Sequence, residues 1–429
     1  AATPQARCAA GSLPETGRQG RVPPADRASG RSARGYRCNT TLVSSFGSTG
    51  GFKTLRYVDA RGRECAYFDV PSSAAEPGVQ VLDMTDPRAP RRTARLTTPA
   101  MTSPHESLDV NQARGLLVAV MGNAATAPGI LDVYDVRTDC RTPRLLSSSP
   151  VGIAGHEGGM SPDGRTFFAT SALTSTVVAI DLDDPSSPRP LWVGAHFTHG
   201  VSVSADGRRA YLSLFPPSVL LPRGSLRATT GAPGIRVLDI SQIQDRAPNP
   251  QVPVLSDTTW PTVSFPQNSV PLRIAGRPYL LQFDEFADVA EKVVGAARIL
   301  DLADERRPRV VSDLRLEVNQ SVHRQEQAQD PGADAVLGGY SAHYCAAPSR
   351  VDPGIVACSF VLSGMRVFDV RDPAKPREVA YDSPPQPGDT VAATVSAPAF
   401  VPARRELWYT DGAAGFRVVR LSAGAWPRR

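Results

Sequence analysis

One pattern recurs seven times along the chain and limits what the chain can fold into. Each copy starts at a glycine or another small residue, continues as an alternating apolar segment, and in six copies ends in Asp. Alternation with period two is typical of a β-strand, and the Asp-Pro-x-x-Pro that often follows is typical of a turn. The copies begin at Gly78, Gly129, Thr176, Gly234, Ala296, Gly364 and Gly415.

The residues that end these segments are aligned acids in all copies but the last. Their spacings run from 46 residues (Asp135 to Asp181) to 68 residues (Asp301 to Asp369). Because Asp commonly accepts a hydrogen bond from a nearby backbone amide, we expect these carboxylates to cap turns between repeats. The full set is Asp83, Asp135, Asp181, Asp239, Asp301 and Asp369, with Arg420 in the last copy.

A second signature precedes each copy, an Asp-Gly or similar turn followed by an apolar strand. Ser161-Pro-Asp-Gly-Arg-Thr-Phe-Phe-Ala is one example. Each repeat then contains four antiparallel strands, which is the organisation of a propeller blade. We therefore predict an all-β, seven-bladed β-propeller over residues 41–429, preceded by a largely irregular extension over residues 1–40. Residues 41–46 resemble a fourth strand without a blade, and we expect them to complete the seventh blade and close the ring.

The repeat resembles the LVIVD repeat of secreted bacterial propeller proteins. The resemblance is carried by copies such as GVQVLDMTDPRAP at Gly78 and GMRVFDVRDPAKP at Gly364, and it covers about residues 41–421. The copies depart from it at Cys140, at Ser241-Gln-Ile-Gln and at Arg420. The resemblance implies a secreted propeller and specifies no reaction.

Composition excludes some classes of function. The chain has 429 residues, a net charge of +5 and 21% charged residues, with basic residues spread among the 42 acids. A nucleic-acid-binding face needs clustered basic residues, so we expect no nucleic-acid partner. No run of about 18 apolar residues occurs, so we expect no membrane span.

The six cysteines indicate an oxidising compartment. Cys345 and Cys358 flank a turn-like segment and could bridge neighbouring strands, whereas the pairing of Cys8, Cys38, Cys65 and Cys140 stays open. The chain begins Ala-Ala-Thr-Pro-Gln, as expected after removal of a signal peptide. We therefore expect a secreted or periplasmic protein.

Five of the six histidines lie just before a predicted innermost strand of a blade or in the long entry loop of blade 6. Three of them stand five residues before equivalent points of the repeat: His156, His199 and His343. His105 stands six residues before its own such point, and Glu106 occupies the fifth position. First strands line the channel of a propeller, so we expect His105, His156, His199 and His343 to converge there and bind a transition metal (Fe, Cu or Zn). The alternative is that they are packed or solvated channel residues.

Acidic residues near these histidines are candidates for proton transfer. Glu157 follows His156 directly and Glu106 follows His105, so either could act as a general base or orient an imidazole. Asp284 and Glu285 end another predicted strand, and there surface solvation is the favoured interpretation. His196 fits a supporting position beside His199, and His323 fits a site or the surface equally well.

Two hypotheses of different classes follow. The first is a metalloenzyme that oxidises, hydrolyses or eliminates a small organic substrate at an open coordination position. Its precedent is architectural, since carotenoid-cleavage oxygenases, which are also seven-bladed, hold iron with four histidines. The second is a non-catalytic module that binds a protein or a cell-envelope component through long loops, at residues 214–230 and 319–339.

Overall fold

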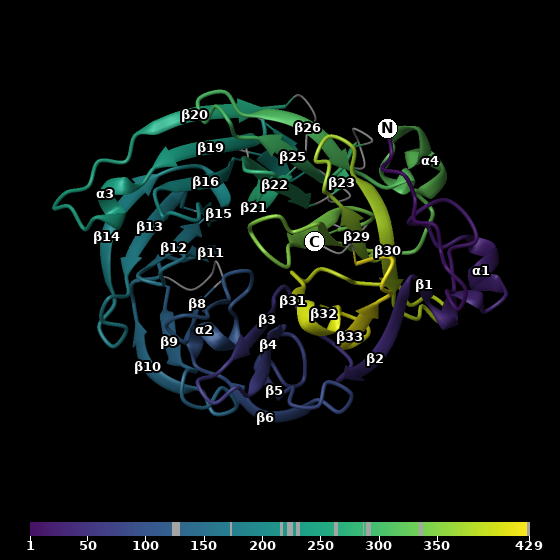
Figure 1. Cartoon of the computed structure of the whole chain (residues 1–429), viewed down its shortest axis with the longest axis horizontal. Helices are drawn as coiled ribbons and strands as arrows, with labels where there is room; N and C mark the ends of the chain where they lie inside the picture. Colours follow the sequence, from purple (N-terminus) through teal and green to yellow (C-terminus); the bar gives the residue numbers. More distant parts are fainter. Residues whose placement is uncertain are drawn as a thin grey trace. The chain divides into compact units, whose positions relative to one another are not determined.

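The computed structural model describes residues 1–121, 129–171, 174–214, 218–220, 226–228, 232–260, 265–285, 287–288, 293–333 and 338–426. The predicted fold class is confirmed, because the chain is an all-β, seven-bladed propeller. In blades 1 to 5 the strands follow their sequence order, whereas in blades 6 and 7 an N-terminal strand, β1 or β2, joins strands from the end of the chain (Figure 1). The chain divides into two compact units: unit 1 (Ala1–Gly50, Phe215–Pro233 and Thr259–Arg429) and unit 2 (Gly51–Leu214 and Gly234–Thr258).

Unit 2 contains blades 1 to 4. Blade 1 consists of β3 (Thr54–Val58), β4 (Glu64–Val70), β5 (Gly78–Asp83) and β6 (Arg91–Leu96). Blade 2 consists of β7 (Asp109–Asn111), β8 (Leu116–Val120), β9 (Leu131–Asp135) and β10 (Arg144–Ser149). Blade 3 consists of β11 (Glu157–Met160), β12 (Thr166–Ser171), β13 (Thr176–Asp181) and β14 (Arg189–Ala195). Blade 4 consists of β15 (Thr198–Val203), β16 (Arg209–Leu214), β19 (Gly234–Asp239) and β20 (Val254–Thr259). Two short helices join these strands: α2 (Pro99–Thr102) and α3 (Ser241–Gln244).

Unit 1 contains blades 5 to 7. Blade 5 consists of β21 (Phe265–Ile274), β22 (Arg277–Glu285), β25 (Ala297–Asp301) and β26 (Arg309–Leu314). Blade 6 consists of β27 (Ala342–Ala346), β28 (Ile355–Phe360), β29 (Gly364–Asp369), β30 (Arg377–Ser383) and β1 (Tyr36–Cys38). Blade 7 consists of β31 (Ala399–Val401), β32 (Glu406–Asp411), β33 (Gly415–Leu421) and β2 (Thr40–Phe46).

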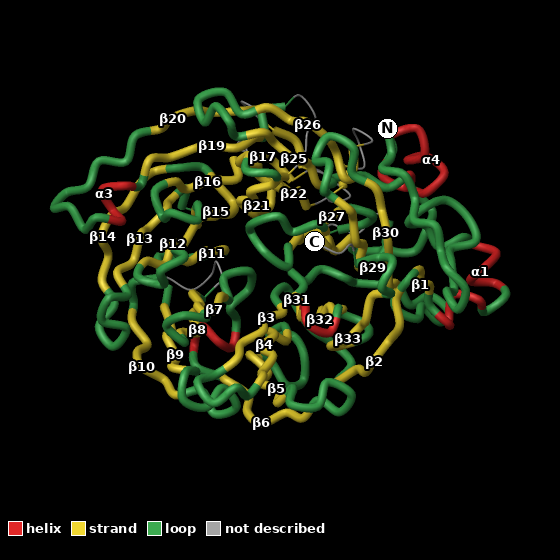
Figure 2. The backbone as a smooth tube through the Cα atoms, in the orientation of Figure 1, coloured by secondary structure: helices red, strands yellow, loops and turns green. Residues whose placement is uncertain are grey.

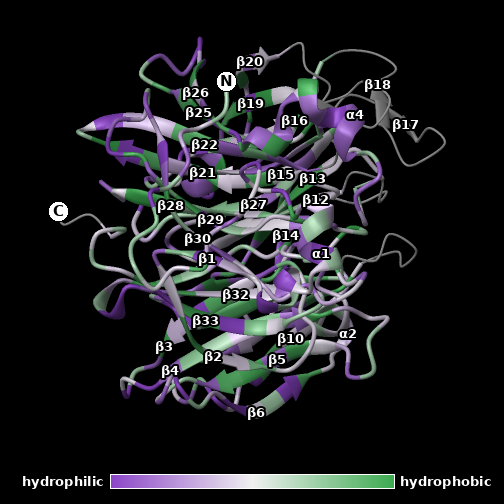
Figure 3. Cartoon of the chain, turned by 90° about the vertical axis from the view of Figure 1, so that its right-hand side faces the viewer, coloured by the Kyte–Doolittle hydropathy of each residue, from purple (hydrophilic) through white to green (hydrophobic). Residues whose placement is uncertain are grey.

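The remaining elements of unit 1 are short. Two hairpins pair β17 (Ser218–Leu220) with β18 (Leu226–Ala228) and β23 (Ala287–Asp288) with β24 (Val293–Val294). The helices are α1 (Pro24–Ala28) and the hydrophilic α4 (Arg324–Gln327; Figure 3). Single 3-10 turns occur at Arg31–Arg34, Glu317–Asn319, Ser321–His323 and Pro402–Arg404. The two long loops expected to bind a partner, 214–230 and 319–339, lie in part outside the described residues.

The core of unit 2 lies between its blades, which explains why the strands are apolar on both faces. In β8, Leu117 and Ala119 pack into a cluster shared with blade 1, whereas Leu116, Val118 and Val120 pack into a cluster shared with blade 3. Successive side chains of a strand point to opposite faces, so the near-continuous apolar run Leu-Leu-Val-Ala-Val supplies two cores. Each fully buried aliphatic side chain contributes about 1.5–3 kcal/mol of stabilisation.

The aligned aspartates cap turns inside the blades, which corrects the expected position between repeats. Each accepts a hydrogen bond from the backbone amide two residues later, as Asp83 does from Thr85 at 3.0 Å and Asp301 does from Ala303 at 2.8 Å. Because Asp83 ends β5, the capped turn links the third and fourth strands of one blade. The same contact is made by Asp135, Asp181, Asp239 and Asp369.

The predicted closing strand is confirmed. Strand β2 pairs antiparallel with β33 from Thr40, opposite Leu421, to Phe46, opposite Phe416. The N-terminal strand therefore completes the blade whose other three strands lie near the end of the chain. The preceding residues 1–40 also contribute β1, which pairs with β30 at the edge of blade 6.

A buried charged network holds the N-terminal segment against blade 6. The Arg366 guanidinium donates to the carboxylates of Glu15 and Glu378, the latter at 3.1 Å. The Gln19 side-chain amide donates to the second Glu378 oxygen at 3.1 Å. We call these four residues the strap network, because they tie residues distant in sequence to the same strands.

Three disulfides are present, and they fit an oxidising compartment. The expected pair Cys345–Cys358 is confirmed, and the other pairs are Cys8–Cys38 and Cys65–Cys140. None of the described helices has the length and apolar character needed to cross a membrane.

Candidate metal centre

Four residues singled out in the sequence lie together inside unit 2: His105, Glu106, His156 and His199. We call them the histidine cluster. They lie where the first strands of blades 2, 3 and 4 begin, since His156 directly precedes β11 and His199 is the second residue of β15. The strands β7, β11 and β15 lie side by side (Figure 2).

The side chains of the cluster converge on one carboxylate oxygen. Oε2 of Glu106 lies 3.3 Å from Nε2 of His156, 3.3 Å from Nε2 of His199 and 3.6 Å from Nδ1 of His105. The Nε2 atoms of His156 and His199 are 3.0 Å apart, and the ring centroids of His105 and His156 are 4.1 Å apart. Three blades thus present nitrogen and oxygen atoms to one small volume.

The cluster is buried on one side and accessible on the other. The side chains of Glu106 and His199 are 1% and 3% exposed, whereas those of His105 and His156 are 31% and 26% exposed. Burial raises the pKa of Glu106, but the neighbouring imidazoles, His105 and His199 foremost, outweigh it and hold that pKa well below its usual value. The Glu106 carboxylate is therefore a poorly hydrated acceptor surrounded by imidazoles.

A tight turn lets two consecutive residues reach the same centre. His105 has a φ of +48°, in the left-handed region that non-glycine residues rarely adopt. The turn is fixed because Ser107 donates from its amide and its hydroxyl to the carbonyl of Pro104. In a regular strand the side chains of His105 and Glu106 would point to opposite faces, so this turn is what brings them together.

The spacing of the ligand atoms fits a transition-metal ion. Ligand atoms about 2.1 Å from one ion lie about 3.0 Å apart at right angles and about 3.4 Å apart at the tetrahedral angle. The three separations among Glu106 Oε2, His156 Nε2 and His199 Nε2 lie between 3.0 and 3.3 Å. A single ion bound by these three atoms accounts for all three separations. The buried His and Glu side chains could therefore hold a metal ion.

Glu157, the other predicted acid, lies beside the cluster with a cationic partner. Its carboxylate is fully buried, and Oε1 lies 3.1 Å from Nζ of Lys53. The backbone of Glu157 forms a parallel bridge with that of Glu106. Lys53 directly precedes β3, and no sequence motif around it marks it as a residue of the site.

His343, the fourth predicted metal ligand, belongs to unit 1. Its Nδ1 donates to the carbonyl of Val395 at 2.7 Å, so its Nε2 is the atom that faces Glu285, at 3.3 Å, and Gln267, at 3.2 Å. Its participation in metal binding stays a prediction.

The expectation that Asp284 and Glu285 are solvated surface residues is wrong. Asp284 is fully buried in a two-point ion pair with Arg298 (2.9 and 2.7 Å), and Glu285 is 6% exposed beside His343. The ion pair with Arg298 accounts for the burial of Asp284, and we therefore regard Asp284 as a structural residue.

The two remaining histidines have different surroundings. His196 accepts a hydrogen bond at Nδ1 from the Arg236 guanidinium at 3.2 Å, and its ring lies against that of Trp192. Burial and the Arg236 charge lower the pKa of His196. His323 ends a 3-10 turn in unit 1 and is half-buried.

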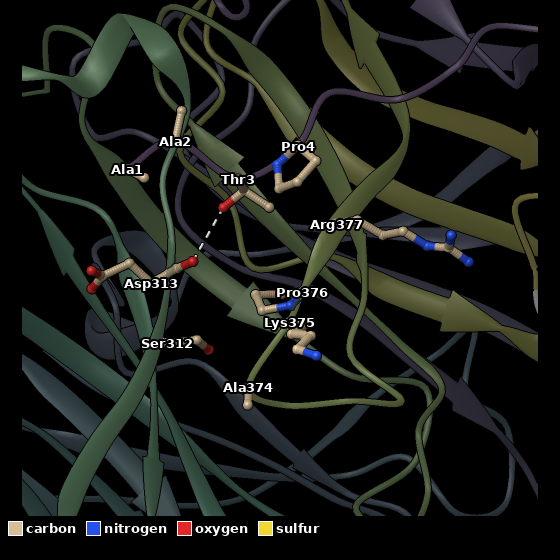
Figure 4. Close-up of a pocket in the computed structure, with 10 residues that line it drawn as sticks. All are labelled: Ala1, Ala2, Thr3, Pro4, Ser312, Asp313, Ala374, Lys375, Pro376 and Arg377. Atoms are coloured by element: carbon tan, nitrogen blue, oxygen red, sulfur yellow. Dashed lines mark hydrogen bonds between the residues drawn. The ribbon is translucent and has the colours of Figure 1, made fainter.

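A pocket in unit 1 offers no comparable chemistry. It encloses about 540 Å³, and its lining consists of Ala1, Ala2, Thr3, Pro4, Ser312, Asp313, Ala374, Lys375, Pro376 and Arg377 (Figure 4). The Thr3 hydroxyl donates to the backbone carbonyl of Asp313 at 3.1 Å. The lining has one carboxylate and no histidine, so the histidine cluster is the better candidate for chemistry.

Comparisons with known proteins support the fold alone. No protein-family model matches the chain, and none of the curated proteins matches its sequence with significance. Among solved structures, hydrazine synthase from Kuenenia stuttgartiensis is similar with a TM-score of 0.55 and 12% identity, covering 89% of this chain and 97% of that chain. The Cps50 (Swd1) β-propeller domain from Myceliophteria thermophila has a TM-score of 0.54 and 11% identity, covering 89% of this chain and 100% of its own. The chain is thus similar in fold to distant propellers, and its assignment to the LVIVD-repeat proteins stays a prediction.

Proposed function

We propose that the protein is an extracytoplasmic metalloenzyme whose histidine cluster binds one first-row transition-metal ion. His156, His199 and Glu106 are the proposed core ligands, and His105 is the proposed fourth. The observation that carries the proposal is the set of three separations, 3.0, 3.3 and 3.3 Å, among two imidazole nitrogens and one carboxylate oxygen. Three disulfides support an oxidising compartment.

The donor set favours oxidation of a small organic substrate. Two imidazoles and one carboxylate on one face of an ion are the ligands typical of non-haem Fe(II) oxygenases, and imidazole also suits Cu and Zn. Such an ion supplies coordination positions for dioxygen, water or substrate. The exposed sides of His105 and His156 offer the approach from solvent.

The protein side chains would bind, orient and handle protons. Glu106 brings negative charge to a buried position. The cluster should therefore bind a cation more tightly than two neutral imidazoles alone would. Glu157, paired with Lys53, is the proposed proton-transfer group beside the cluster. If zinc is the resident ion, the same groups support hydrolysis or elimination instead.

Metal analysis of the purified protein tests this proposal. We expect about one Fe, Cu or Zn per chain, lost in the double variant His156→Ala/His199→Ala. The matched control is His196→Ala, which removes a histidine that contacts Arg236 and Trp192 in the same unit. A folded protein that binds no metal would contradict the proposal and favour the non-catalytic module.

Azide, a small anion that coordinates open metal positions, separates a catalytic site from a closed structural one. After loading with Co²⁺, we expect azide to shift the visible absorption bands of the wild-type protein. An unchanged spectrum at saturating azide would show a closed site and contradict the catalytic part of the proposal.

A further inference from the structure

The residues immediately before β3 form a second layer around one side of the histidine cluster. They are Gly51, Phe52 and Lys53, and we call them the clamp segment. The ring centroid of Phe52 lies 4.5 Å from that of His105, and Lys53 reaches Glu157. A three-residue segment thus contacts one cluster member and the acid beside the cluster.

Asp69, on β4, holds the clamp segment in place. Its backbone carbonyl accepts from the amide of Gly51 at 2.8 Å, and its carboxylate accepts from the amide of Lys53 at 3.0 Å. A Cβ atom at Gly51 would lie 1.8 Å from Asp69 Oδ2, so only glycine allows this approach. The side chain of Lys53 fixes the other end of the segment through its ion pair with the fully buried Glu157.

This fixation bears on His105, the histidine with the greatest exposure in the cluster. Its backbone adopts the left-handed conformation, and one face of its ring is covered by Phe52 while His156 lies 4.1 Å away. A strained backbone persists only where its surroundings hold it. Without the Phe52 ring, His105 would gain rotamers in which its imidazole leaves the cluster, and the entropy of restoring it would oppose metal binding.

We propose that Phe52 is a positioning residue for His105 and that Asp69 is the anchor that makes it one. The inference rests on the proposed metal centre. Neighbours that orient metal ligands change metal affinity by about 10- to 100-fold when they are mutated. We expect a change of that size at Phe52 although it contributes no ligand atom.

Co²⁺ titration of the metal-free protein, followed by visible absorption, tests the inference. Phe52→Leu is expected to weaken Co²⁺ binding by about 10-fold or more and to shift the absorption bands, because His105 no longer holds its place. Phe52→Tyr retains the ring and should restore both the affinity and the spectrum. Trp192→Leu is the matched control, because Trp192 contacts His196 at 5.8 Å between ring centroids, outside the cluster.

A second variant covers the case in which Phe52→Leu fails to fold. Asp69→Asn keeps the shape of the anchor and replaces one acceptor oxygen by a donor, so the amides of the clamp segment lose a partner. We expect weaker Co²⁺ binding here too. The control Asp411→Asn should bind Co²⁺ as the wild type does, because Asp411 is a buried aspartate of blade 7 that accepts from the amides of Ala393 and Ala413.

Wild-type Co²⁺ affinity and spectrum retained in folded Phe52→Leu would overturn the inference. If the wild-type protein itself binds no Co²⁺, the proposed metal centre fails instead. If the wild type binds Co²⁺ through His156 and His199 but Phe52→Leu leaves the affinity unchanged, only the positioning role fails.

Discussion

Two buried polar groups of this molecule differ in how their carboxylates are neutralised. In the strap network of unit 1, Glu15 and Glu378 share the guanidinium of Arg366, whose side chain is fully buried. In the histidine cluster of unit 2, Glu106 is equally buried but lies among imidazoles, which are cationic only when protonated. A guanidinium is always charged, so the strap network has a permanent cation between its carboxylates. The histidine cluster gains a full counter-charge only from protons or a metal ion.

The nature of the counter-charge distinguishes buried charges that are structural from those that could serve chemistry. The Arg366 side chain also donates to the carbonyl of Ser363 and lies over the Tyr381 ring, so its position is fixed on several sides. Such a pair is costly to break and adds little chemistry. A carboxylate beside three imidazoles has an adjustable counter-charge, which is what a metal site requires.

The largest expected effect is the loss of the N-terminal segment. Deleting residues 1–46 removes β2 from β33, Glu15 from Arg366 and Gln19 from Glu378. We expect unit 1 to lose cooperative unfolding and the protein to aggregate, because a sheet edge and a buried charge become exposed. Thermal unfolding and light scattering measure this. A truncated protein that melts like the full chain would contradict the closure of blade 7 by this strand.

Breaking the strap network should be the costliest single substitution. Arg366→Met leaves two buried carboxylates without their cation, and such changes cost about 3–5 kcal/mol of unfolding free energy. Denaturant unfolding measures the loss, and Arg88→Met, which breaks the exposed pair with Asp86, serves as control. Equal losses in the two variants would refute the structural importance of the strap network.

Asp69 offers a third kind of buried carboxylate, held mainly by backbone amides. Burial raises its pKa to about 6, against the opposing effect of the amides of Lys53 and Phe52. Because the folded pKa exceeds the unfolded value, the folded state binds the proton more tightly, and this site destabilises the protein as pH rises from about 4 to about 6. The shift corresponds to about 3 kcal/mol at most.

Unfolding free energies across pH 4 to 7 measure this effect. The wild-type protein should lose stability relative to Asp69→Asn over that window, because asparagine does not titrate. A difference between the two proteins that does not change with pH would show that the Asp69 pKa is not raised.

Replacing one carboxylate in each group should separate stability from metal binding. Glu106→Gln keeps the shape and removes the charge, so we expect metal affinity to fall about 100-fold, equivalent to about 2.7 kcal/mol. The unfolding free energy of the metal-free protein should change little. Glu378→Gln should do the reverse, and Co²⁺ titration together with denaturant unfolding of both variants measures the contrast. If Glu106→Gln lowers only stability, the cluster is a structural network like the strap.

The parts of the fold that repeat in sequence were predictable, and the long-range contacts were not. Seven strand-and-turn signatures indicated the blades, and the apolar strand at residues 41–46 indicated the closing strand. The position of Glu106 at the register of His156 and His199 pointed to a shared location, because equivalent residues of repeated units occupy equivalent places. Glu15 and Arg366 are 351 residues apart and leave no local pattern.

The residues proposed to support the metal centre also have no signature in the sequence. Phe52 and Asp69 act through packing and backbone hydrogen bonds, which most residue types can provide, so no motif marks them. The adjacent glycines Gly50 and Gly51 were the one available signal, since paired glycines often allow a close backbone approach. The burial of Asp284 has no local sequence signal, because its partner, Arg298, lies on the next strand of the sheet.

Anomalous diffraction at the absorption edges of Fe, Cu and Zn tests the central claim most directly. A crystal of protein purified without chelators should show one anomalous peak about 2.0–2.2 Å from Nε2 of His156, Nε2 of His199 and a carboxylate oxygen of Glu106. Data collected on either side of each edge identify the element. A cluster without an anomalous peak after soaking in each metal, with the imidazoles hydrogen-bonded to one another instead, would contradict the account.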